Sequence, residues 1–388
     1  MNLTKARPLQ MKKSAKPAAF GTPRSKPARR SGTGVPPVRI GTPGRDARAT
    51  ARKVAELENL LSEPTAAAVE AMRELEGDLI LLGVAGKMGP TLARMAKRAS
   101  EAAGVKRRII GVSRFSNPAD EPALRSHGIE TIRCDLLDED AIASLPDAPN
   151  VVFMTGMKFG ATGNEPLTWA MNVHLPALVC RKFRRSRIAA FSTGNIYGLT
   201  PVARGGSVET DMPLPVGEYA MSCLGRERMF EHFSRALGIP VVLLRLNYAV
   251  ELRYGVLADL ARKVWAGEPV DLAMGHFNCI WQADANAMTL QSLALATSPA
   301  LVLNVTGPGV LRVRDVCEAL ADRLRRRVRF TGEEAPTALL NNASAAQKLL
   351  GSPATSLDTM LGRVAGWVKR GGASLGKPTH FESRDGKF

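Results

Sequence analysis

Short, uninterrupted apolar runs recur along the middle of the chain, and segments with helical spacing separate them. The runs that predict strands are Asp78–Leu82, Arg108–Ser113, Glu130–Cys134, Asn150–Thr155, Ile188–Ser192 and Pro240–Leu246. Runs without alternation are typical of parallel strands that are covered on both faces. The longest helical stretches between them are Thr91–Ala103, Leu167–Arg184 and Tyr219–Leu237. This succession of βα units predicts an α/β fold with a doubly wound parallel sheet.

The alternation weakens on both sides of this region. Beyond Asn247, three helical stretches and a strand at Ala300–Val305 predict a smaller, interleaved C-terminal lobe that holds the substrate. Pro64 interrupts the helical spacing that precedes the first strand. The predicted organisation is a disordered basic leader (1–53), a helical lead-in (54–77), a nucleotide-binding domain (78–246), the smaller lobe (247–370) and a tail (371–388).

Charge is distributed unevenly along the chain. The net charge is +17, but residues 1–53 hold 14 lysines and arginines against one acid. The remaining residues are therefore nearly balanced, which makes nucleic acid an unlikely partner of the folded part. The leader is rich in Lys, Arg, Pro and Gly, a composition that cannot offset its ordering entropy by burial, and it lacks the apolar core of a secretory signal.

The five cysteines are widely separated and form no CxxC pair, and the five histidines are scattered. No metal cluster is expected from this pattern, and reduced thiols in a cytoplasm are the simplest interpretation. No apolar run approaches the roughly 20 residues that a membrane-spanning helix requires. The expected partner is a small molecule.

The first predicted strand runs directly into Gly83, Gly86 and Gly89, and a helical stretch follows. A strand, a glycine turn and a helix start present backbone N–H groups and the positive helix end to a phosphate. Gly83 permits a sharp turn, Gly86 removes a Cβ where a pyrophosphate approaches, and Gly89 lets the helix pack closely on the sheet. The spacing is GxxGxxG, and it predicts a dinucleotide site.

With this alternation, the chain resembles the extended short-chain dehydrogenase/reductases, the group of NAD(P)-dependent epimerases and dehydratases. The resemblance covers 78–370 and implies a Rossmann-like fold, binding of the cofactor by the loop with Lys87 and Met88, and a homodimer. Its motifs, in the family's order, are Gly83-x-x-Gly86-x-x-Gly89, Asp135-Leu136, Asn172-Val173, Ser192–Gly198, Glu209–Tyr219, Arg245–Tyr248, Asp284 and Asn304-Val305. In this family the Asp135-Leu136 position holds the adenine.

The end of the second strand bears on the choice of cofactor. An acid there binds a ribose 2′-hydroxyl and favours NAD, whereas a cation accommodates a 2′-phosphate. Here the strand ends in Ser113-Arg114, and no acid is in reach. A hydroxyl and a guanidinium suit a phosphate, and Lys87 adds positive field. NADP is therefore predicted, with NAD as the second choice.

The resemblance also places chemistry on Tyr219 as the acid or base and on Thr193 as the donor to the reacting oxygen. A free tyrosine has a pKa of about 10, and the family's Tyr-x-x-x-Lys lowers it with an ammonium one turn on. In this chain Cys223 occupies the lysine position. Gly194-Asn195 replaces the Asp-Glu pair of sugar dehydratases, so an epimerase or reductase is favoured, acting on a nucleotide sugar or a similar substrate.

Three interpretations of the missing lysine remain open. Lys158, just past the fourth strand, could supply the cation, and Arg226 is less favoured because it is expected to point further along the helix. Cys223 could itself act as a thiolate, although buried helical cysteines are mostly small apolar fillers. The site could also have lost hydride chemistry, which would leave a dinucleotide-binding regulator or an RNA-associated protein.

Overall fold

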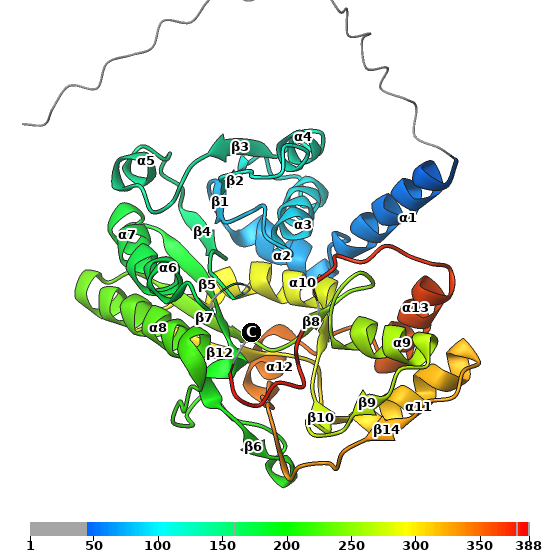
Figure 1. Ribbon diagram of the computed structural model, residues 1–388. Helices are drawn as coiled ribbons and strands as arrows, with labels where there is room; N and C mark the ends of the chain where they lie inside the picture. The colour runs from blue at the N-terminus through cyan, green and yellow to red at the C-terminus, as the bar shows by residue number, and fades with distance from the viewer. Residues whose placement is uncertain (1–44, 159, 161, 378, 387–388) are drawn as a thin grey trace, which may run out of the picture. The chain divides into compact units, whose positions relative to one another are not determined.

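A seven-stranded parallel sheet forms the centre of the protein, with the order β3-β2-β1-β4-β5-β7-β12 (Figure 1). The computed structural model describes residues 45–388 except 159, 161, 378 and 387–388. The direction of strand succession reverses between β1 and β4, and ligands of such sheets bind outside the carboxyl ends of the strands at this point. The strands are β1 (Leu79–Leu82), β2 (Ile109–Ser113), β3 (Glu130–Arg133), β4 (Asn150–Phe153), β5 (Arg187–Thr193), β7 (Val241–Leu246) and β12 (Leu301–Val305).

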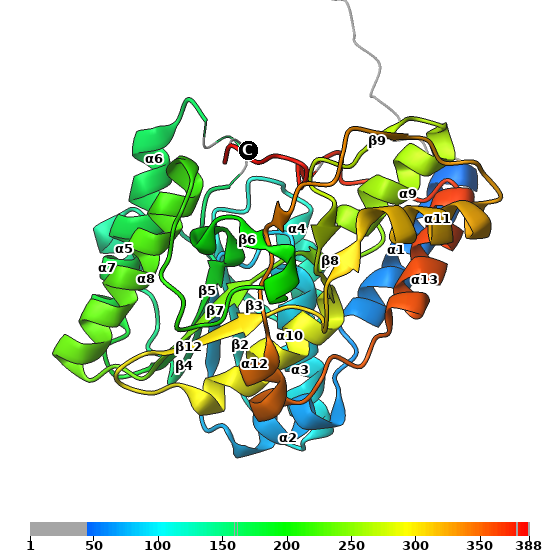
Figure 2. The same cartoon turned by 90° about the horizontal axis from the view of Figure 1, so that it is seen from below.

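Helices cover both faces of the sheet, which confirms the doubly wound fold (Figure 2). Leu79 and Leu81 of β1 contribute to one apolar core, and Ile80 and Leu82 contribute to the other. The first core is completed by α2 (Ala66–Glu74), α3 (Gly89–Ala102), α4 (Asp120–Arg125) and α10 (Gln282–Ser292). The second is completed by α5 (Glu139–Ala143), α7 (Leu175–Lys182) and α8 (Gly217–Leu237).

A third core lies beside the sheet. Leu57 and Leu61 pack there with the apolar faces of three helices from the second half of the chain. Leu57 and Leu61 belong to α1 (Arg45–Leu61), and the three helices are α9 (Val256–Ala266), α11 (Val313–Leu324) and α13 (Leu357–Lys369). Four two-stranded ladders accompany them: β6 (Thr200–Pro201) with β15 (Thr337–Ala338), β8 (Ala249–Val250) with β11 (Ile280–Trp281), β9 (Val270–Asp271) with β14 (Phe330–Thr331), and β10 (His276–Phe277) with β13 (Leu311–Arg312).

Some boundaries differ from those predicted. The predicted leader extended to residue 53, but α1 begins at Arg45, because Leu57 and Leu61 further along that helix gain burial that local composition does not show. The rest of the leader, 1–44, lies outside the described residues. The predicted helix 167–184 is divided into α6 (Glu165–Trp169), a π-helical turn (Ala170–His174) and α7. The strand predicted at 300–305 joins the central sheet as β12, beside β7.

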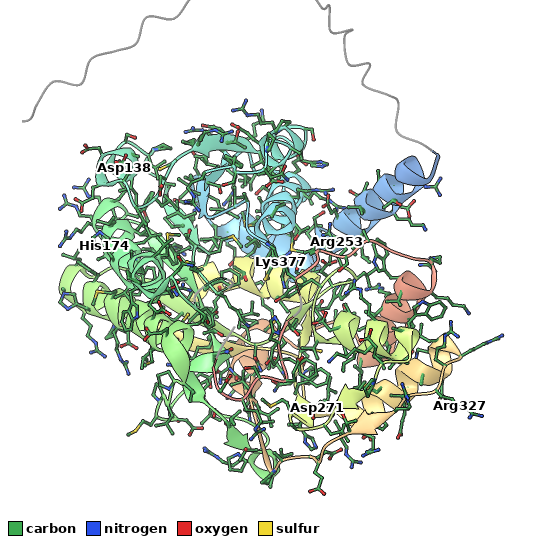
Figure 3. The ribbon with its side chains drawn as sticks, viewed as in Figure 1. Asp138, His174, Arg253, Asp271, Arg327 and Lys377 are labelled. Carbon is green, nitrogen blue, oxygen red and sulfur yellow. The ribbon has the colours of Figure 1, made fainter. Side chains whose placement is uncertain are left out.

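The predicted tail is ordered along most of its length. After α13 the chain returns past α9 toward the carboxyl ends of the strands (Figures 1 and 2, red). Leu375 donates its N–H to the carbonyl of Arg253, near the labelled Lys377 in Figure 3. We call residues 371–377 and 379–386 the C-terminal strap. Its Phe381 is 2% exposed and packs in the third core, a long-range contact that the sequence pattern did not indicate.

Gly89 illustrates how tightly the first βα unit is packed. A Cβ at Gly89 would lie 2.1 Å from the carbonyl oxygen of Val84. We expect Gly89→Ala to lower the free energy of unfolding by about 1–3 kcal/mol, because backbone must move to relieve the clash. Gly362, in α13, faces open space and is the control: Gly362→Ala is expected to stabilise by about 0.5–1 kcal/mol. Urea unfolding measures both, and equal effects would contradict the packing argument.

Two further short elements are α12 (Ser344–Leu350), which packs near β12, and a 3₁₀ turn at Gly194–Tyr197. No helix among the described residues is long and apolar enough to cross a bilayer.

Candidate active site

Two adjoining cavities of about 140 and 240 Å³ lie at the carboxyl ends of β4, β5 and β7. The smaller extends toward β8 and Thr379, and the larger extends toward Gly86 and the end of β4. The residues that line both are Lys87, Met88, Lys158, Ser192, Tyr219 and Tyr254. The structure thus brings together the predicted residues Gly86, Lys87, Met88, Lys158, Thr193 and Tyr219.

The glycine loop has the shape that a dinucleotide requires. Gly83 has φ +91°, and a Cβ there would lie 2.6 Å from Oγ1 of Thr155. A Cβ at Gly86 would meet only the carbonyl oxygen of Gly83, at 3.2 Å, and otherwise open space. Thr155 Oγ1 is buried without a hydrogen-bond partner among the described residues. The loop, this hydroxyl and the start of α3 at Gly89 fit a nicotinamide dinucleotide.

Lys87 turns its ammonium away from the loop toward the smaller lobe. Its Nζ lies 3.3 Å from the ring centroid of Tyr254 and donates to the carbonyl oxygen of Ala249 at 3.4 Å. Lys87 as a whole is exposed, and its ammonium lies against the Tyr254 ring and the Ala249 carbonyl. Desolvation lowers the pKa of Lys87 to about 7, Glu251 acts in the opposite direction, and Lys158 lowers it further. A cation so placed favours an anionic ligand.

Tyr219 lies in the first turn of α8 and faces both cavities. Burial raises the pKa of Tyr219 well above its usual range, and Cys223 raises it further. Arg226 and a hydrogen bond with Thr193 act in the opposite direction. Thr193 is placed by Asn195, whose N–H it accepts at 3.2 Å and whose Oδ1 it donates to at 3.0 Å. At neutral pH the Tyr219 phenol is therefore protonated.

Cys223, in the lysine position, is fully buried and packs with Ile196 and Tyr197. Burial is the main cause that raises the pKa of the Cys223 thiol. A thiol in such surroundings is a poor nucleophile. The structure thus favours the interpretation of Cys223 as an apolar filler over that of a catalytic thiolate.

The expectation that Arg226 points further along the helix is wrong, because its side chain lines the larger cavity. It is 5% exposed and lines the larger cavity together with Tyr219, since residues seven apart lie on one helix face. Its guanidinium donates to the carbonyl oxygen of Phe191 at 2.9 Å and to Oδ1 of Asn172. Arg226 is therefore a cation held in a fixed place, and it favours the ionised form of Tyr219.

Lys158 supplies a second cation from the loop after β4. Its Nζ lies 5.7 Å from the ring centroid of Tyr219, and desolvation lowers the pKa of Lys158 to about 8. Asn172, which is fully buried, holds the preceding residue in place. It accepts from the N–H of Met157 at 3.0 Å and donates to the Met157 carbonyl at 3.2 Å. Its amide also donates to Ser222 Oγ at 2.9 Å, which ties this loop to α8.

A buried ionic network supports the floor of the site. Glu227, with 0% exposure, pairs with Arg245 at 2.8 Å and accepts from Ser192 Oγ at 2.5 Å. Arg245 also donates to the hydroxyl of Tyr197 at 2.5 Å, and that hydroxyl donates to Asn304 Oδ1 at 2.9 Å. The network joins α8, β5, β7 and β12 directly beneath Thr193 and Tyr219.

The remaining predicted cofactor residues lie outside these cavities, at the ends of β2 and β3. Ser113 is the last residue of β2, and Arg114 is exposed beside it. Asp135 accepts the N–H of Leu137 at 3.1 Å and so closes its own turn, and Leu136 is buried in the second core. These residues occupy the sheet edge where the adenosine half of a dinucleotide is expected.

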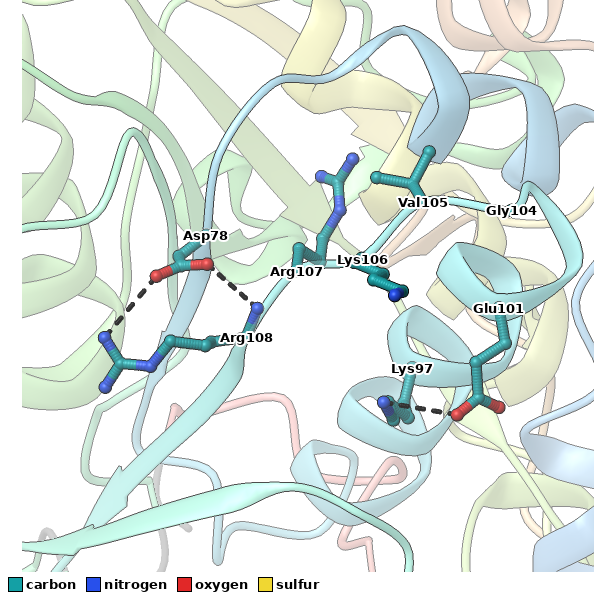
Figure 4. A pocket seen from close by; sticks show the side chains of 8 residues that line it. All are labelled: Asp78, Lys97, Glu101, Gly104, Val105, Lys106, Arg107 and Arg108. Carbon is teal, nitrogen blue, oxygen red and sulfur yellow. Dashed lines mark hydrogen bonds and ion pairs between the residues drawn. The ribbon is translucent and has the colours of Figure 1, made fainter.

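A larger cavity, of about 570 Å³, opens at the opposite edge of the sheet (Figure 4). Asp78 pairs there with Arg108, and Lys97 pairs with Glu101. This edge carries the amino ends of the strands, away from the glycine loop. Among the described residues, no group of three or more histidine, cysteine or acidic side chains could hold a metal ion.

Comparison with known proteins agrees with this geometry. The sequence model of the NAD dependent epimerase/dehydratase family matches residues 79–273, half of the chain. The chain belongs to this family, and a nicotinamide dinucleotide is the cofactor class. No curated protein matches the sequence significantly.

Solved structures extend the likeness over most of the fold. UDP-glucuronic acid 4-epimerase from Bacillus cereus, in complex with NAD, has 18% identity and a TM-score of 0.63, with 76% of this chain and 99% of that chain covered. UDP-glucose 4-epimerase from Thermotoga maritima, with UDP-glucose, has 17% identity and a TM-score of 0.62, with 76% of this chain and 99% of that chain covered. dTDP-glucose 4,6-dehydratase from Bacillus anthracis, in complex with NAD, has 13% identity and a TM-score of 0.64, with 76% of this chain and 97% of that chain covered. At these identities the likeness shows the fold alone.

Sequence reasoning ranked Arg226 too low and missed other residues that line the cavities. Arg226 could have been found from its spacing of seven from Tyr219 on one helix face. Tyr254 and Thr379 gave no comparable signal, because they reach the site through contacts between distant segments. The contact between the Lys87 ammonium and the Tyr254 ring likewise arises only in the folded chain.

Proposed function

We propose that the chain is a nicotinamide-dependent epimerase or reductase whose Tyr219 transfers a proton to or from a substrate oxygen. The observation that carries this proposal is the convergence of Tyr219, Thr193 and a fixed Arg226 on cavities beside the glycine loop. The structural relatives are described with UDP-glucose or UDP-glucuronic acid as ligands. A nucleotide sugar or a similar hydroxyl-bearing compound is the corresponding substrate class.

The cofactor would be held by Gly83, Gly86 and Gly89, with Lys87 and Met88 between them. When bound, a nicotinamide dinucleotide supplies hydride transfer. Ser113 and Arg114 would contact a 2′-phosphate, and this is the basis for proposing NADP over NAD. Asp135 and Leu136 would border the adenine.

Residues of the protein would transfer the proton to or from the substrate oxygen. Because burial raises the pKa of Tyr219, its phenol holds the proton that a substrate carbonyl would take up, and stabilisation of the phenolate by Arg226 would offset the lower acidity that burial causes. Thr193, whose hydroxyl donates to Asn195 Oδ1, would turn that hydrogen bond to the same substrate oxygen, and Arg226 would stabilise the phenolate that remains. Lys158 would replace the missing lysine as a neighbouring cation near the reacting end of the site. A homodimer through α7 and α8 and a cytoplasmic location stay predictions.

A second candidate is a catalytically impaired dinucleotide-binding regulator or RNA-associated protein. The observation in its favour is Cys223 in the lysine position together with a raised Tyr219 pKa, since both oppose formation of a tyrosinate base. One experiment separates the two candidates. Full-length protein is mixed with NADPH or NADH and a panel of keto sugars and sugar acids, and absorbance at 340 nm is followed. A reductase is expected to oxidise the cofactor with one substrate class, and an epimerase is expected to interconvert sugar epimers with no net change at 340 nm, which chromatography of the products detects. Tight cofactor binding with neither reaction on any of them would favour the regulator.

The proposed role of Arg114 gives a separate prediction. Arg114→Ala is expected to weaken NADPH binding about tenfold or more and to leave NADH binding unchanged, because only NADPH carries the 2′-phosphate. The matched control is Arg327→Ala, an exposed arginine of the smaller lobe (Figure 3). Titration calorimetry with both cofactors measures the difference. Equal weakening of both cofactors, or of neither, would contradict the preference for NADP.

A further inference from the structure

The C-terminal strap forms one wall of the smaller cavity. Thr379 of the strap is 2% exposed and lines this cavity opposite Tyr219 and Lys87. Its N–H and its hydroxyl both donate to Oδ2 of Asp259, at 2.9 and 2.7 Å. Thr379 is therefore held against α9 and forms a wall of the substrate space.

The strap is anchored on both sides of that wall. Phe381 packs in the third core, with its ring centroid 6.1 Å from that of Phe277. Arg384 donates to the carbonyl oxygen and the hydroxyl of Thr337, at 2.9 and 2.7 Å. At its end the strap reaches the start of α8, where a Cβ at Gly217 would lie 2.5 Å from the carbonyl oxygen of Gly386. It thus bridges the smaller lobe and the helix that carries Tyr219.

The size of the smaller cavity indicates which ligands fit its walls. Sites for drug-sized ligands measure about 300–1,000 Å³. The smaller cavity, of about 140 Å³, is the one lined by β8 and the strap, whereas the larger adjoins the glycine loop and the end of β4, where the cofactor is expected. The walled part of the substrate side therefore matches a compound about the size of a monosaccharide, and an attached nucleotide would have to extend beyond it.

The charge of the smaller cavity also bears on which ligands it favours. Lys87 and Lys158 both line the smaller cavity, and, in addition to desolvation, the positive charge of Lys158 lowers the pKa of Lys87. Acids lie nearby at Glu251 and Asp259, but Glu251 is paired with Arg253 at 3.1 Å and Asp259 accepts from Thr379. An anionic group on the ligand would relieve the repulsion between the two ammonium groups.

Building on the proposed function, and narrowing its substrate class to the members without a nucleotide, we propose that the substrate is a small anionic hydroxy or keto compound, with Lys87 binding its acid group and the strap excluding nucleotide sugars. The shared chemistry is a carboxylate or phosphate on a compound of monosaccharide size. Lys87 faces Tyr254 and Ala249 of the substrate side, so its contact is with the substrate rather than with the adenosine half of the cofactor.

Titration calorimetry on the full-length protein saturated with NADPH tests this. The probes are glucuronate, glucose 6-phosphate, glucose and UDP-glucose, and the first two distinguish a carboxylate from a phosphate. We expect at least one acid to bind about tenfold or more tightly than glucose, and Lys87→Met to remove that advantage. Lys106→Met, which changes an exposed lysine at the opposite edge of the sheet, is the control and should leave binding unchanged.

Two variants test the strap. Arg384→Ala removes its hydrogen bonds to Thr337, and a chain ending at Lys377 removes its wall and its anchors; UDP-glucose is expected to bind at least one folded variant but not the wild type. Equal or tighter binding of UDP-glucose by the wild type, or no effect of Lys87→Met on acid binding, would overturn the inference. Since binding needs no hydride transfer, acid binding without turnover would contradict only the proposed function.

Discussion

Replacement of Tyr219 by phenylalanine is expected to slow substrate reduction about 10²–10⁴-fold. The change removes the only group proposed to deliver a proton to the substrate oxygen and leaves the ring packing of Tyr219 in place. Cofactor affinity should not change, because the glycine loop and the end of β2 are untouched. Single-turnover absorbance at 340 nm measures the chemical step, and NADPH titration measures the binding.

The same variant separates catalysis from structure. An intact thermal unfolding profile together with lost turnover supports proton transfer by Tyr219. A loss of less than threefold would show that another group delivers the proton. Cys223→Ala provides the comparison, because a buried neutral thiol that only fills space should retain most of the rate.

Replacement of Glu227 by glutamine is expected to lower the free energy of unfolding by about 3–5 kcal/mol. Glu227 is fully buried, and its carboxylate is the charge partner of Arg245, which is 3% exposed. Without that carboxylate, Arg245 would keep a buried positive charge with only neutral acceptors. The Ser192 hydroxyl would lose its charged acceptor as well, so the floor of the site would loosen.

Urea unfolding measures this effect against an exposed pair. Glu56→Gln, which breaks the surface pair of Glu56 with Arg52, is the control and should cost about 0.5 kcal/mol or less. If Glu227→Gln cost no more than the control, the buried pair would not be a structural support. The double variant Glu227→Gln with Arg245→Met should recover part of the loss, since it removes the stranded charge as well.

The sheet was predictable because its signal is local. Each strand is a short apolar run that needs cover on both faces, and the alternation of Leu79 and Leu81 with Ile80 and Leu82 between two cores accounts for such a run. The smaller lobe was less predictable. Its strands are two-residue ladders, and α1 and Phe381 join its core from the two ends of the described chain. Local hydrophobic periodicity does not predict contacts between segments that are so far apart in the sequence.

The residues of the candidate site likewise divide into those with a local sequence signal and those placed by contacts between distant segments. Gly86, Lys87, Thr193 and Tyr219 follow the ends of strands or begin helices, so motif order was enough to bring them to one edge of the sheet. Arg226 was misjudged because its orientation depends on the carbonyl of Phe191 and on Asn172, which draw the guanidinium toward the cavity. Thr379 was assigned to a tail, since its partner Asp259 is 120 residues away.

The most direct measurement is deuterium transfer from 4-deuterated NADPH to a substrate, with wild type and Cys223→Lys compared side by side. If Arg226 and Lys158 replace the missing lysine, the wild type transfers deuterium, and Cys223→Lys brings no large gain because the space beside Tyr219 is already occupied. Transfer by Cys223→Lys alone, with none by the wild type, would contradict the proposal that this site performs hydride chemistry without that lysine.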